Sequence, residues 1–288
     1  MPTLRQYNAA LAVIHLVLGI GFMMYFQRIN SLYPNDPIQG VEMSIRNHNL
    51  QLTANQQNQV TGQWVSRQTQ QVPISTFQKL LVGFFLVTAA FHMVYYATDQ
   101  RGGLYPQMLA TGNNYLRWVE YSISSTMMLY IIALISGVKD DNVYKSLFAM
   151  NVAMIYTGQL VEEKIQRGEN WYLPMFMGFM LLMTEFTIIV RDFQSRITDI
   201  KTFVDANPNI SNGRTIPEWV KYMVWVLFLF FSSFGFISLY GAYAGIAYEK
   251  VEQLYLVFSL AAKATLAGFI AYGTSQRQAA QNQTEVVN

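Results

Sequence analysis

The chain has 288 residues, of which 52% are hydrophobic, 15% aromatic and only 12% charged, and its formal net charge is +2. A soluble domain carries about 25% charged residues, so most of this surface does not face water. The small net charge gives no indication of nucleic-acid binding, and the absence of cysteine excludes disulfides, a thiol nucleophile and thiolate metal sites.

Seven apolar runs approach the length of about 20 residues that a helix needs to cross a bilayer core. They cover residues 8–27, 77–98, 114–138, 143–162, 172–190, 218–247 and 251–274. These runs predict an all-α membrane protein, with a seven-transmembrane helix bundle over residues 1–276 that is integral to the lipid bilayer. The first run is too long for a signal peptide and is expected to stay as a helix. The sequence contains no internal repeat, no Gly-rich phosphate loop and no cluster of metal ligands.

The connection between the first two runs, residues 28–76, is a long polar stretch that is expected to cap one face of the bundle. Its middle, LQLTANQQNQVTGQWVSRQ, partly alternates, which indicates a short β-hairpin; a disordered loop is the alternative. A second long connection, from Asp192 to Pro217, contains DANPNISNGRTIP, which is typical of turns. The end of the chain, residues 277–288, is polar and is predicted to be a disordered tail.

Lysine and arginine are distributed unevenly over the two sides of the predicted bundle. The side opposite the N-terminus carries more of them, including those of both long connections. The positive-inside rule places that side in the cytoplasm, although the rule weighs mainly charges in short loops and near span ends.

Few ionisable residues fall inside the predicted helices, and the central ones are His15, His92, Glu120, Glu185 and Lys263. A charged lysine at the centre of a membrane helix costs about 2.5–3.5 kcal/mol on insertion scales, so Lys263 is expected to have a partner or a covalent bond. At about 1.5 Å per residue, His15, His92 and Glu120 lie roughly 9–10 Å from the N-terminal side, and Lys263 roughly 18 Å. The lysine side chain leans back toward that layer. We therefore expect four polar residues on four helices to converge, with the Lys263 nitrogen beside the Glu120 carboxylate.

Two spacings extend this predicted cluster. Arg117, Glu120 and Ser124 follow each other at i, i+3 and i+7 and share one helix face, where the arginine can steady the carboxylate. Ser259 lies four residues before Lys263 and can hydrogen-bond its nitrogen. Because a buried ion pair alone stabilises a fold poorly, we interpret the pair as serving chemistry.

The same residues also have structural interpretations. The lysine–glutamate pair can be an assembly device, and His15 or His92 can be core histidines bonded to backbone carbonyls. Glu185 can be hydrogen-bonded to a neighbouring helix, and Glu162, in VEEK at the end of a run, can face lipid headgroups. The functional alternative for these two glutamates is a proton path.

Seven runs, a mid-membrane lysine in the last and an acid early in the third resemble the retinal-binding rhodopsins, and most closely the heliorhodopsin family. The segments LRWVEYSISSTMM, FAMNVAMIYTGQLVEEK, FLFFSSFGF and VFSLAAKATLAGFIAYG carry the resemblance. It implies that all-trans retinal is bound to Lys263 as a protonated Schiff base, with Glu120 as counterion and Ser259 as a neighbour. His15 and His92 would line the polar cavity on the counterion side.

The resemblance also implies pocket residues in the fourth and sixth runs, namely Asn151, Met154, Ser233 and Phe234. It implies a homodimer with the N-terminus in the cytoplasm, which is opposite to the orientation from the positive-inside rule. The expected function is that of a photoreceptor with a slow signalling photocycle and not of an enzyme. The sequence does not identify a signalling partner.

Two positions differ from proton-pumping microbial rhodopsins, which usually have a carboxylate donor eleven residues after the counterion and an acid four residues before the lysine. Here these positions are Ile131 and Ser259. Both differences argue against an ordinary outward pump. A light-driven or light-gated proton transporter that uses Glu162 or Glu185 is the alternative function, and a retinal-free receptor or transporter with a structural ion pair is a third.

Overall fold

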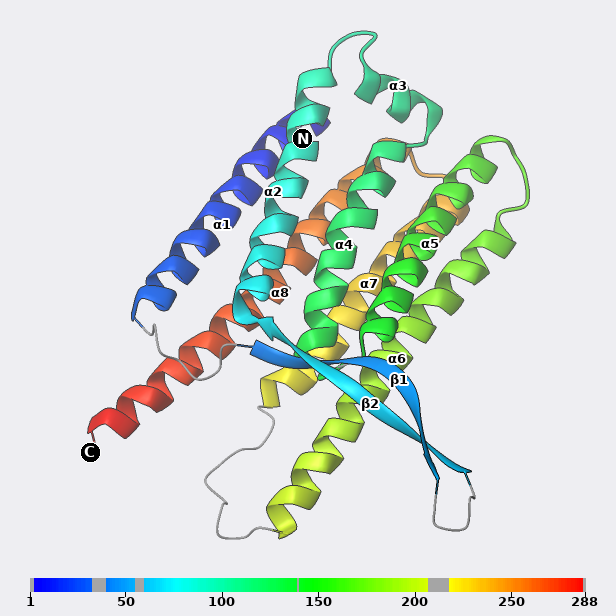
Figure 1. Ribbon diagram of the computed structural model, residues 1–288. Helices are drawn as coiled ribbons and strands as arrows, with labels where there is room; N and C mark the ends of the chain where they lie inside the picture. Colours follow the sequence, from blue (N-terminus) through cyan, green and yellow to red (C-terminus); the bar gives the residue numbers. More distant parts are fainter. Residues whose placement is uncertain (1–2, 33–39, 55–59, 139, 207–217, 287–288) are drawn as a thin grey trace.

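Long helices run side by side in the computed structural model and form a bundle, and a two-stranded sheet lies at one of its ends (Figure 1). The structure describes residues 3–32, 40–54, 60–138, 140–206 and 218–286. In chain order the elements are α1 (Leu4–Leu32), β1 (Gly40–Ala54), β2 (Val60–Pro73), α2 (Ile74–Thr98), α3 (Leu104–Thr111), α4 (Tyr115–Ile135), α5 (Asp141–Gln166), α6 (Tyr172–Ala206), α7 (Glu218–Ala244) and α8 (Tyr248–Val286).

Six helices in the described part of the chain are long and apolar enough to cross a membrane: α1, α2, α4, α6, α7 and α8. The protein is therefore an all-helical, multi-pass membrane protein in its main body. The seventh long helix, α5, packs against α4 and α6 in the same bundle. It is less apolar because it contains Asn151, Gln159 and the acidic pair Glu162 and Glu163.

Local sequence signals set where α4 and α5 begin and end. The Asn114 side chain accepts a hydrogen bond from the Arg117 N–H at 3.2 Å, and the Asp140 side chain accepts one from the Asn142 N–H at 3.0 Å. Between the helices, Gly137 adopts φ +89°, a conformation that residues with a Cβ atom rarely reach. The Val138 N–H then donates to the Ala133 carbonyl at 3.0 Å, which closes α4 and turns the chain into α5.

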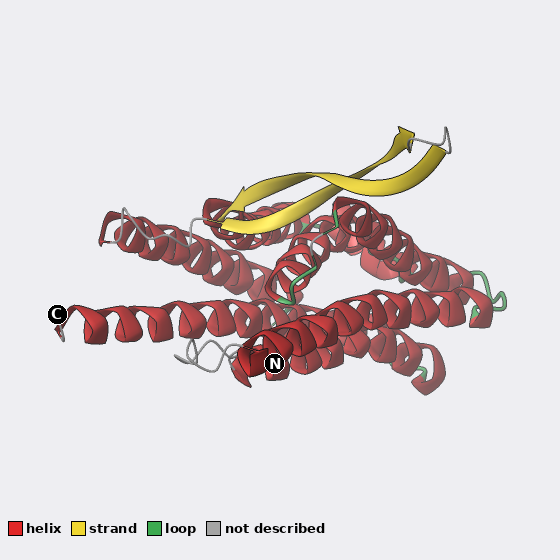
Figure 2. Cartoon of the chain, turned by 60° about the horizontal axis from the view of Figure 1, so that its bottom comes forward, coloured by secondary structure: helices red, strands yellow, loops and turns green. Residues whose placement is uncertain are grey.

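The two strands are antiparallel and pair from Gly40 with Pro73 to Ala54 with Val60, with an irregularity between Ile45 and His48. The sequence left a hairpin and a disordered loop open for this connection, and the structure has strands there. They form a twisted ribbon (Figure 2) at the end of the bundle opposite the N-terminus and α3 (Figure 1).

Three elements differ from the sequence prediction. The connection after the second run contains α3, which is too short to show as a periodic run, yet its Tyr105 and Met108 are buried. Helix α6 continues to Ala206, through much of the connection that was predicted to turn, and residues 207–217 lie outside the described residues. Helix α8 continues to Val286, where a disordered tail was predicted; glutamine and alanine, which are frequent there, are good helix formers.

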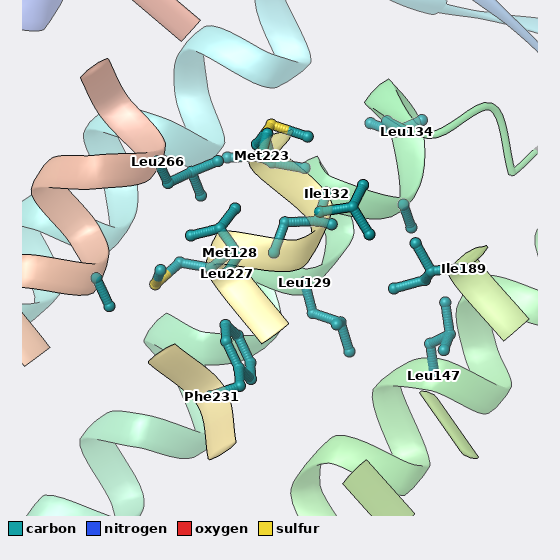
Figure 3. Packing of buried hydrophobic residues seen from close by; sticks show 14 of the residues in the cluster. Met128, Leu129, Ile132, Leu134, Leu147, Ile189, Met223, Leu227, Phe231 and Leu266 are labelled. Carbon is teal, nitrogen blue, oxygen red and sulfur yellow. The ribbon is translucent and has the colours of Figure 1, made fainter. Parts of the chain in front are cut away.

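The largest apolar core lies in the half of the bundle nearer the strands. Side chains from α4, α5, α6, α7 and α8 point toward one another there, and Figure 3 shows Leu129, Ile132, Ile189, Leu227 and Leu266 among them. Lipid tails are as apolar as leucine, so this core contributes close packing more than a hydrophobic driving force. The buried ionisable groups lie mainly toward the other half, where the N-terminus and α3 are found.

Candidate functional site

Lys263 lies in the interior of the bundle and is 2% exposed. Its Nζ atom donates to Glu120 Oε1 at 3.1 Å and to Ser259 Oγ at 2.7 Å. The predicted contact between Lys263 and Glu120 is therefore present, and Ser259 lies at the predicted place one turn earlier on α8. Both charged side chains are almost completely buried, so each relies on the other to offset the loss of water.

The Glu120 carboxylate has a second partner that the sequence did not single out. Thr88 of α2 is buried and donates from Oγ1 to Glu120 Oε1 at 2.5 Å. A threonine in an apolar run has no charge to mark it, and only its position opposite Glu120 distinguishes it from other helix threonines. The same carboxylate oxygen thus accepts hydrogen bonds from α2 and from α8, which fixes its position between the two helices.

A polar cluster continues from Thr88 toward α1. His92 follows Thr88 by one turn on the same face of α2, and its Nδ1 lies 2.8 Å from Asn8 Oδ1. The ring of His15 lies 5.3 Å from that of His92, and its Nδ1 is 2.8 Å from the Leu11 carbonyl oxygen. His15 thus makes the backbone contact of the structural interpretation, whereas His92 binds a side chain. The predicted convergence of four polar residues from four helices is present.

A cavity of about 50 Å³ adjoins Lys263. It is bounded by residues of α4, α5, α7 and α8: Tyr121, Ser124, Ser125, Met128, Met154, Ile155, Phe231, Phe234, Ser259, Ala262 and Lys263. The predicted pocket residues Met154 and Phe234 thus line this cavity, and so does Ser124 from the polar face of α4. A second cavity of about 70 Å³ shares four of these residues and continues the space toward α6.

Two predicted pocket residues do not line the cavity next to Lys263. Ser233 instead donates its hydroxyl to the Phe230 carbonyl at 2.6 Å, because an α-helix lets a serine bond to the preceding turn. Asn151 is buried one layer behind the wall, where its Nδ2 donates to Ser125 Oγ at 2.8 Å and to Thr126 Oγ1 at 2.7 Å. It can therefore act on the cavity only through Ser125.

Arg117 does not pair with Glu120, contrary to the prediction from their shared helix face. Its guanidinium forms ion pairs with Glu162 of α5 and Glu252 of α8. The physical reason is that side chains on a helix lean toward its N-terminus, which carries the Arg117 guanidinium away from Glu120. Two buried carboxylates lie at that end and hold it there.

Several neutral donors complete this group around Arg117. Tyr248 donates to Glu162 at 3.1 Å, Trp118 Nε1 donates to Glu162 Oε2 at 2.8 Å, and Asn114 Nδ2 donates to Glu252 Oε1 at 2.7 Å. We call Arg117, Glu162, Glu252 and Tyr248 the Arg117 cluster. Nearby, burial raises the pKa of Tyr105 in α3, so its hydroxyl stays a neutral donor 3.5 Å from Glu252.

The sequence missed Glu252 and left Glu162 open, for the same reason. Both lie at the ends of apolar runs, where an acid is ordinarily exposed to headgroups. In the structure both are buried, so the headgroup interpretation of Glu162 is wrong. The signal that could have identified both acids is Arg117 at the start of the third run. An arginine that is buried in the bundle requires acidic partners at its own depth.

Glu185 lies on α6 and is fully buried. Neither of its carboxyl oxygens has a hydrogen-bond partner among the described residues. A hydrogen bond to a neighbouring helix, one of the interpretations from the sequence, is thus not found in this part of the chain.

The described residues contain no group of histidine and acidic side chains that could hold a metal ion.

Two comparisons with known proteins found matches to this chain. The family model described as Heliorhodopsin matches residues 4–275, which is most of the chain. No curated protein matches significantly. Among solved structures, a light-driven proton pump from Leptosphaeria maculans superposes with a TM-score of 0.58 at 9% sequence identity, covering 93% of this chain and 96% of that chain. At this identity the likeness shows a common fold.

Proposed function

The chain belongs to the heliorhodopsin family, and we propose that it is a light-absorbing retinal protein that works as a photoreceptor. In this proposal all-trans retinal is bound to Lys263 as a protonated Schiff base, and Glu120 is the counterion. The observation that carries the proposal is the buried Lys263 amine, which adjoins a largely apolar cavity and a buried carboxylate.

The residues that line the cavity beside Lys263 fit retinal in their chemistry. Retinal would supply a polyene that absorbs visible light and an aldehyde that condenses with a primary amine, with loss of one water molecule. Met128, Met154, Phe231 and Phe234 provide apolar walls from α4, α5 and α7. Methionine and aromatic side chains adapt well to an elongated apolar ligand. The charged residue of the cavity lining, by contrast, is Lys263, with Glu120 beside it.

Glu120 and Ser259 would hold a proton on the Lys263 nitrogen. A positive charge in a low-dielectric site needs an anion nearby, or the proton leaves. Thr88 keeps the carboxylate in place by donating to the same oxygen that faces Lys263. An anion at this distance stabilises positive charge on the nitrogen, so the position of Glu120 also sets the colour of the pigment.

We propose His15 and His92 as transient acceptors of the proton that leaves the Lys263 nitrogen after light absorption. Histidine is the side chain whose ordinary titration lies nearest neutral pH, which suits it to reversible proton transfer. Both rings belong to the polar cluster that starts at Thr88, next to Glu120. His15 Nε2 and Asn8 Nδ2 are buried and have no partner within the described ranges, so the cluster has free hydrogen-bonding capacity.

We further propose that the N-terminus lies in the cytoplasm, that the protein forms a homodimer and that a slow photocycle produces a signal. Membership of the family supports all three. The buried Ile131 supports the last, since it offers no proton where pumps have a carboxylate. Labelling an N-terminal tag in intact cells tests the orientation: a tag that reacts from outside would overturn it.

Absorption spectra with and without retinal test the central proposal. Adding all-trans retinal to the retinal-free protein should create a visible band, and Lys263→Ala should abolish it. Lys250→Ala, at the exposed start of the same helix, is the matched control and should keep the band. A visible band in Lys263→Ala would refute the linkage. Glu120→Gln should red-shift or deprotonate the chromophore, and an unchanged spectrum would point to another counterion.

Glu185 favours a second candidate function, a light-driven or light-gated proton transporter. Its buried carboxyl has no hydrogen-bond partner among the residues that the structure describes, and such a group is costly to keep unless it serves a purpose. Glu162 is a weaker candidate because it is held in the Arg117 cluster. Photocurrents in voltage-clamped cells distinguish the two functions. Steady currents that Glu185→Gln or Glu162→Gln abolishes would favour transport over pure sensing, whereas no current would favour the sensor.

A retinal-free receptor or transporter, in which the Lys263–Glu120 pair is only structural, makes a different prediction. Such a protein stays colourless after incubation with all-trans retinal. The same absorption measurement therefore separates this third function from the other two.

A further inference from the structure

Trp118 lies between the space beside Lys263 and the Arg117 cluster. On one side its indole bounds the second cavity, which shares Met154, Ile155, Phe231 and Phe234 with the cavity at Lys263. On the other side its Nε1 donates to Glu162 Oε2 at 2.8 Å. One buried side chain thus contacts both the wall of the apolar space and an ion-paired carboxylate.

The indole is held in place by two residues of α5 that are one turn apart. Gly158 and Glu162 lie on the same helix face. A Cβ atom on Gly158 would come within 2.5 Å of Trp118 Cζ3, so the absence of a side chain there is what lets the ring lie against α5. Glu162 then fixes the ring's orientation through the N–H group. The ring therefore cannot move along α5 without changing the hydrogen bond to Glu162.

Aromatic contacts connect Trp118 to the lysine end of the site. The ring of Tyr121 packs edge-on against Trp118 with centroids 6.3 Å apart, and Lys263 Nζ lies 5.5 Å from the centre of the Tyr121 ring. Tyr255 packs against Trp118 at 5.9 Å and lies under the Arg117 guanidinium at 4.0 Å. A displacement of one of these rings is passed on to the ring that it contacts, since packed protein interiors transmit strain.

Glu162 is the member of the Arg117 cluster that would respond first. Its carboxylate accepts hydrogen bonds from Trp118, Tyr248 and Arg117. If the indole withdraws, a buried anion loses one of its neutral donors, and such a loss is costly for a buried charged group. The carboxylate must then rely more on Tyr248 and Arg117, which belong to α8 and α4. The hydrogen bonding that joins α4, α5 and α8 at this end of the bundle would change.

We propose that Trp118 is the positioning residue that carries the light-induced change from the chromophore space to the Arg117 cluster, by changing its hydrogen bond to Glu162. The inference rests on the proposed function, since it requires a chromophore at Lys263. It assigns the output of the photoreceptor to the end of the bundle where the N-terminus and α3 lie. The step involves no covalent change: one N–H···O hydrogen bond weakens and the proton stays on the indole nitrogen.

Infrared difference spectroscopy of the pigment tests this assignment. Protein made with tryptophan labelled with ¹⁵N in the indole ring should show, in the light-minus-dark spectrum, an N–H stretching band that shifts with the label. Trp118→Phe, which keeps an aromatic ring but removes the donor, should lose this band. The matched control is Trp225→Phe, because Trp225 is 56% exposed on α7 and should keep the band. A label-sensitive band that survives in Trp118→Phe would overturn the assignment.

A second variant keeps the test decisive if Trp118→Phe forms no pigment. Glu162→Gln retains the tryptophan but replaces the carboxylate with a weaker amide acceptor, so the label-sensitive band should move to higher frequency. An unmoved band would overturn the proposal. Visible absorption distinguishes a failure of the Trp118 proposal from a failure of the proposed retinal function. A wild-type pigment without any label-sensitive band refutes only the role of Trp118. A protein that forms no pigment at all refutes both.

Discussion

Replacing Arg117 with glutamine should destabilise the protein more than any surface substitution. Arg117 is ion-paired with Glu162 and Glu252, and all three side chains are buried, at 2%, 7% and 0% exposed. Breaking a buried ion pair by removing one partner costs about 3–5 kcal/mol, because an uncompensated charge is left behind. Two carboxylates lose their partner here, so we expect a loss near the upper end, about 5 kcal/mol of unfolding free energy.

Unfolding of the retinal-free protein in mixed micelles, followed by helical circular dichroism, measures this loss. Arg167→Gln is the matched control, since its contact with Glu163 is 3.8 Å long and largely exposed; it should change stability by less than about 1 kcal/mol. The triple variant Arg117→Gln, Glu162→Gln, Glu252→Gln should recover much of the loss because no buried charge remains. A triple variant no more stable than the single one would refute the reasoning, and so would an Arg117→Gln cost as small as the control's.

Three further predictions concern the packing and the counterion. Thr88→Val removes a hydrogen bond to a buried carboxylate, so it should lower the unfolding free energy by about 1.5–3 kcal/mol in the same assay and shift the visible band. The control Thr184→Val, on the exposed face of α6, should change neither quantity. Leu227→Ala should cost about 2 kcal/mol through the cavity that it leaves, and Leu229→Ala, 66% exposed on the same helix, should cost little. Bleaching the pigment with hydroxylamine should lower its melting temperature, because a ligand that binds only the folded state stabilises it; an unchanged melting temperature would contradict this.

The depth of charged residues could be predicted from the sequence because the rise of an α-helix is nearly constant. Counting residues from one side of the membrane brought Lys263 to the layer of Glu120, His15 and His92, and the structure has them together. The helix boundaries mattered little to this estimate, since an error of a few residues moves each side chain by less than its own length.

Partners on other helices could not be predicted in the same way. The spacing of Arg117 and Glu120 indicates only that they share a face of α4. It does not indicate which side chains of α5 and α8 lie at the same depth. Glu252 was missed because its burial depends on α8 starting within the bundle. Thr88 and Asn8 were missed because neutral polar side chains are common in membrane helices and become informative only when a buried charge lies opposite.

Helices α4 and α8 are joined by two layers of buried charge, the Lys263–Glu120 pair and the Arg117–Glu252 pair. Glu252, Ser259 and Lys263 are spaced i, i+7 and i+11 on one face of α8, while Arg117 and Glu120 are neighbours on α4. Each layer joins the same two helices, so a displacement of α8 against α4 strains both ion pairs at once. Packed interfaces of this kind exchange between discrete arrangements and do not deform gradually. A change at the Lys263 nitrogen is therefore expected to reach the Arg117 cluster as an exchange of hydrogen-bond partners, with α5 drawn in through Glu162.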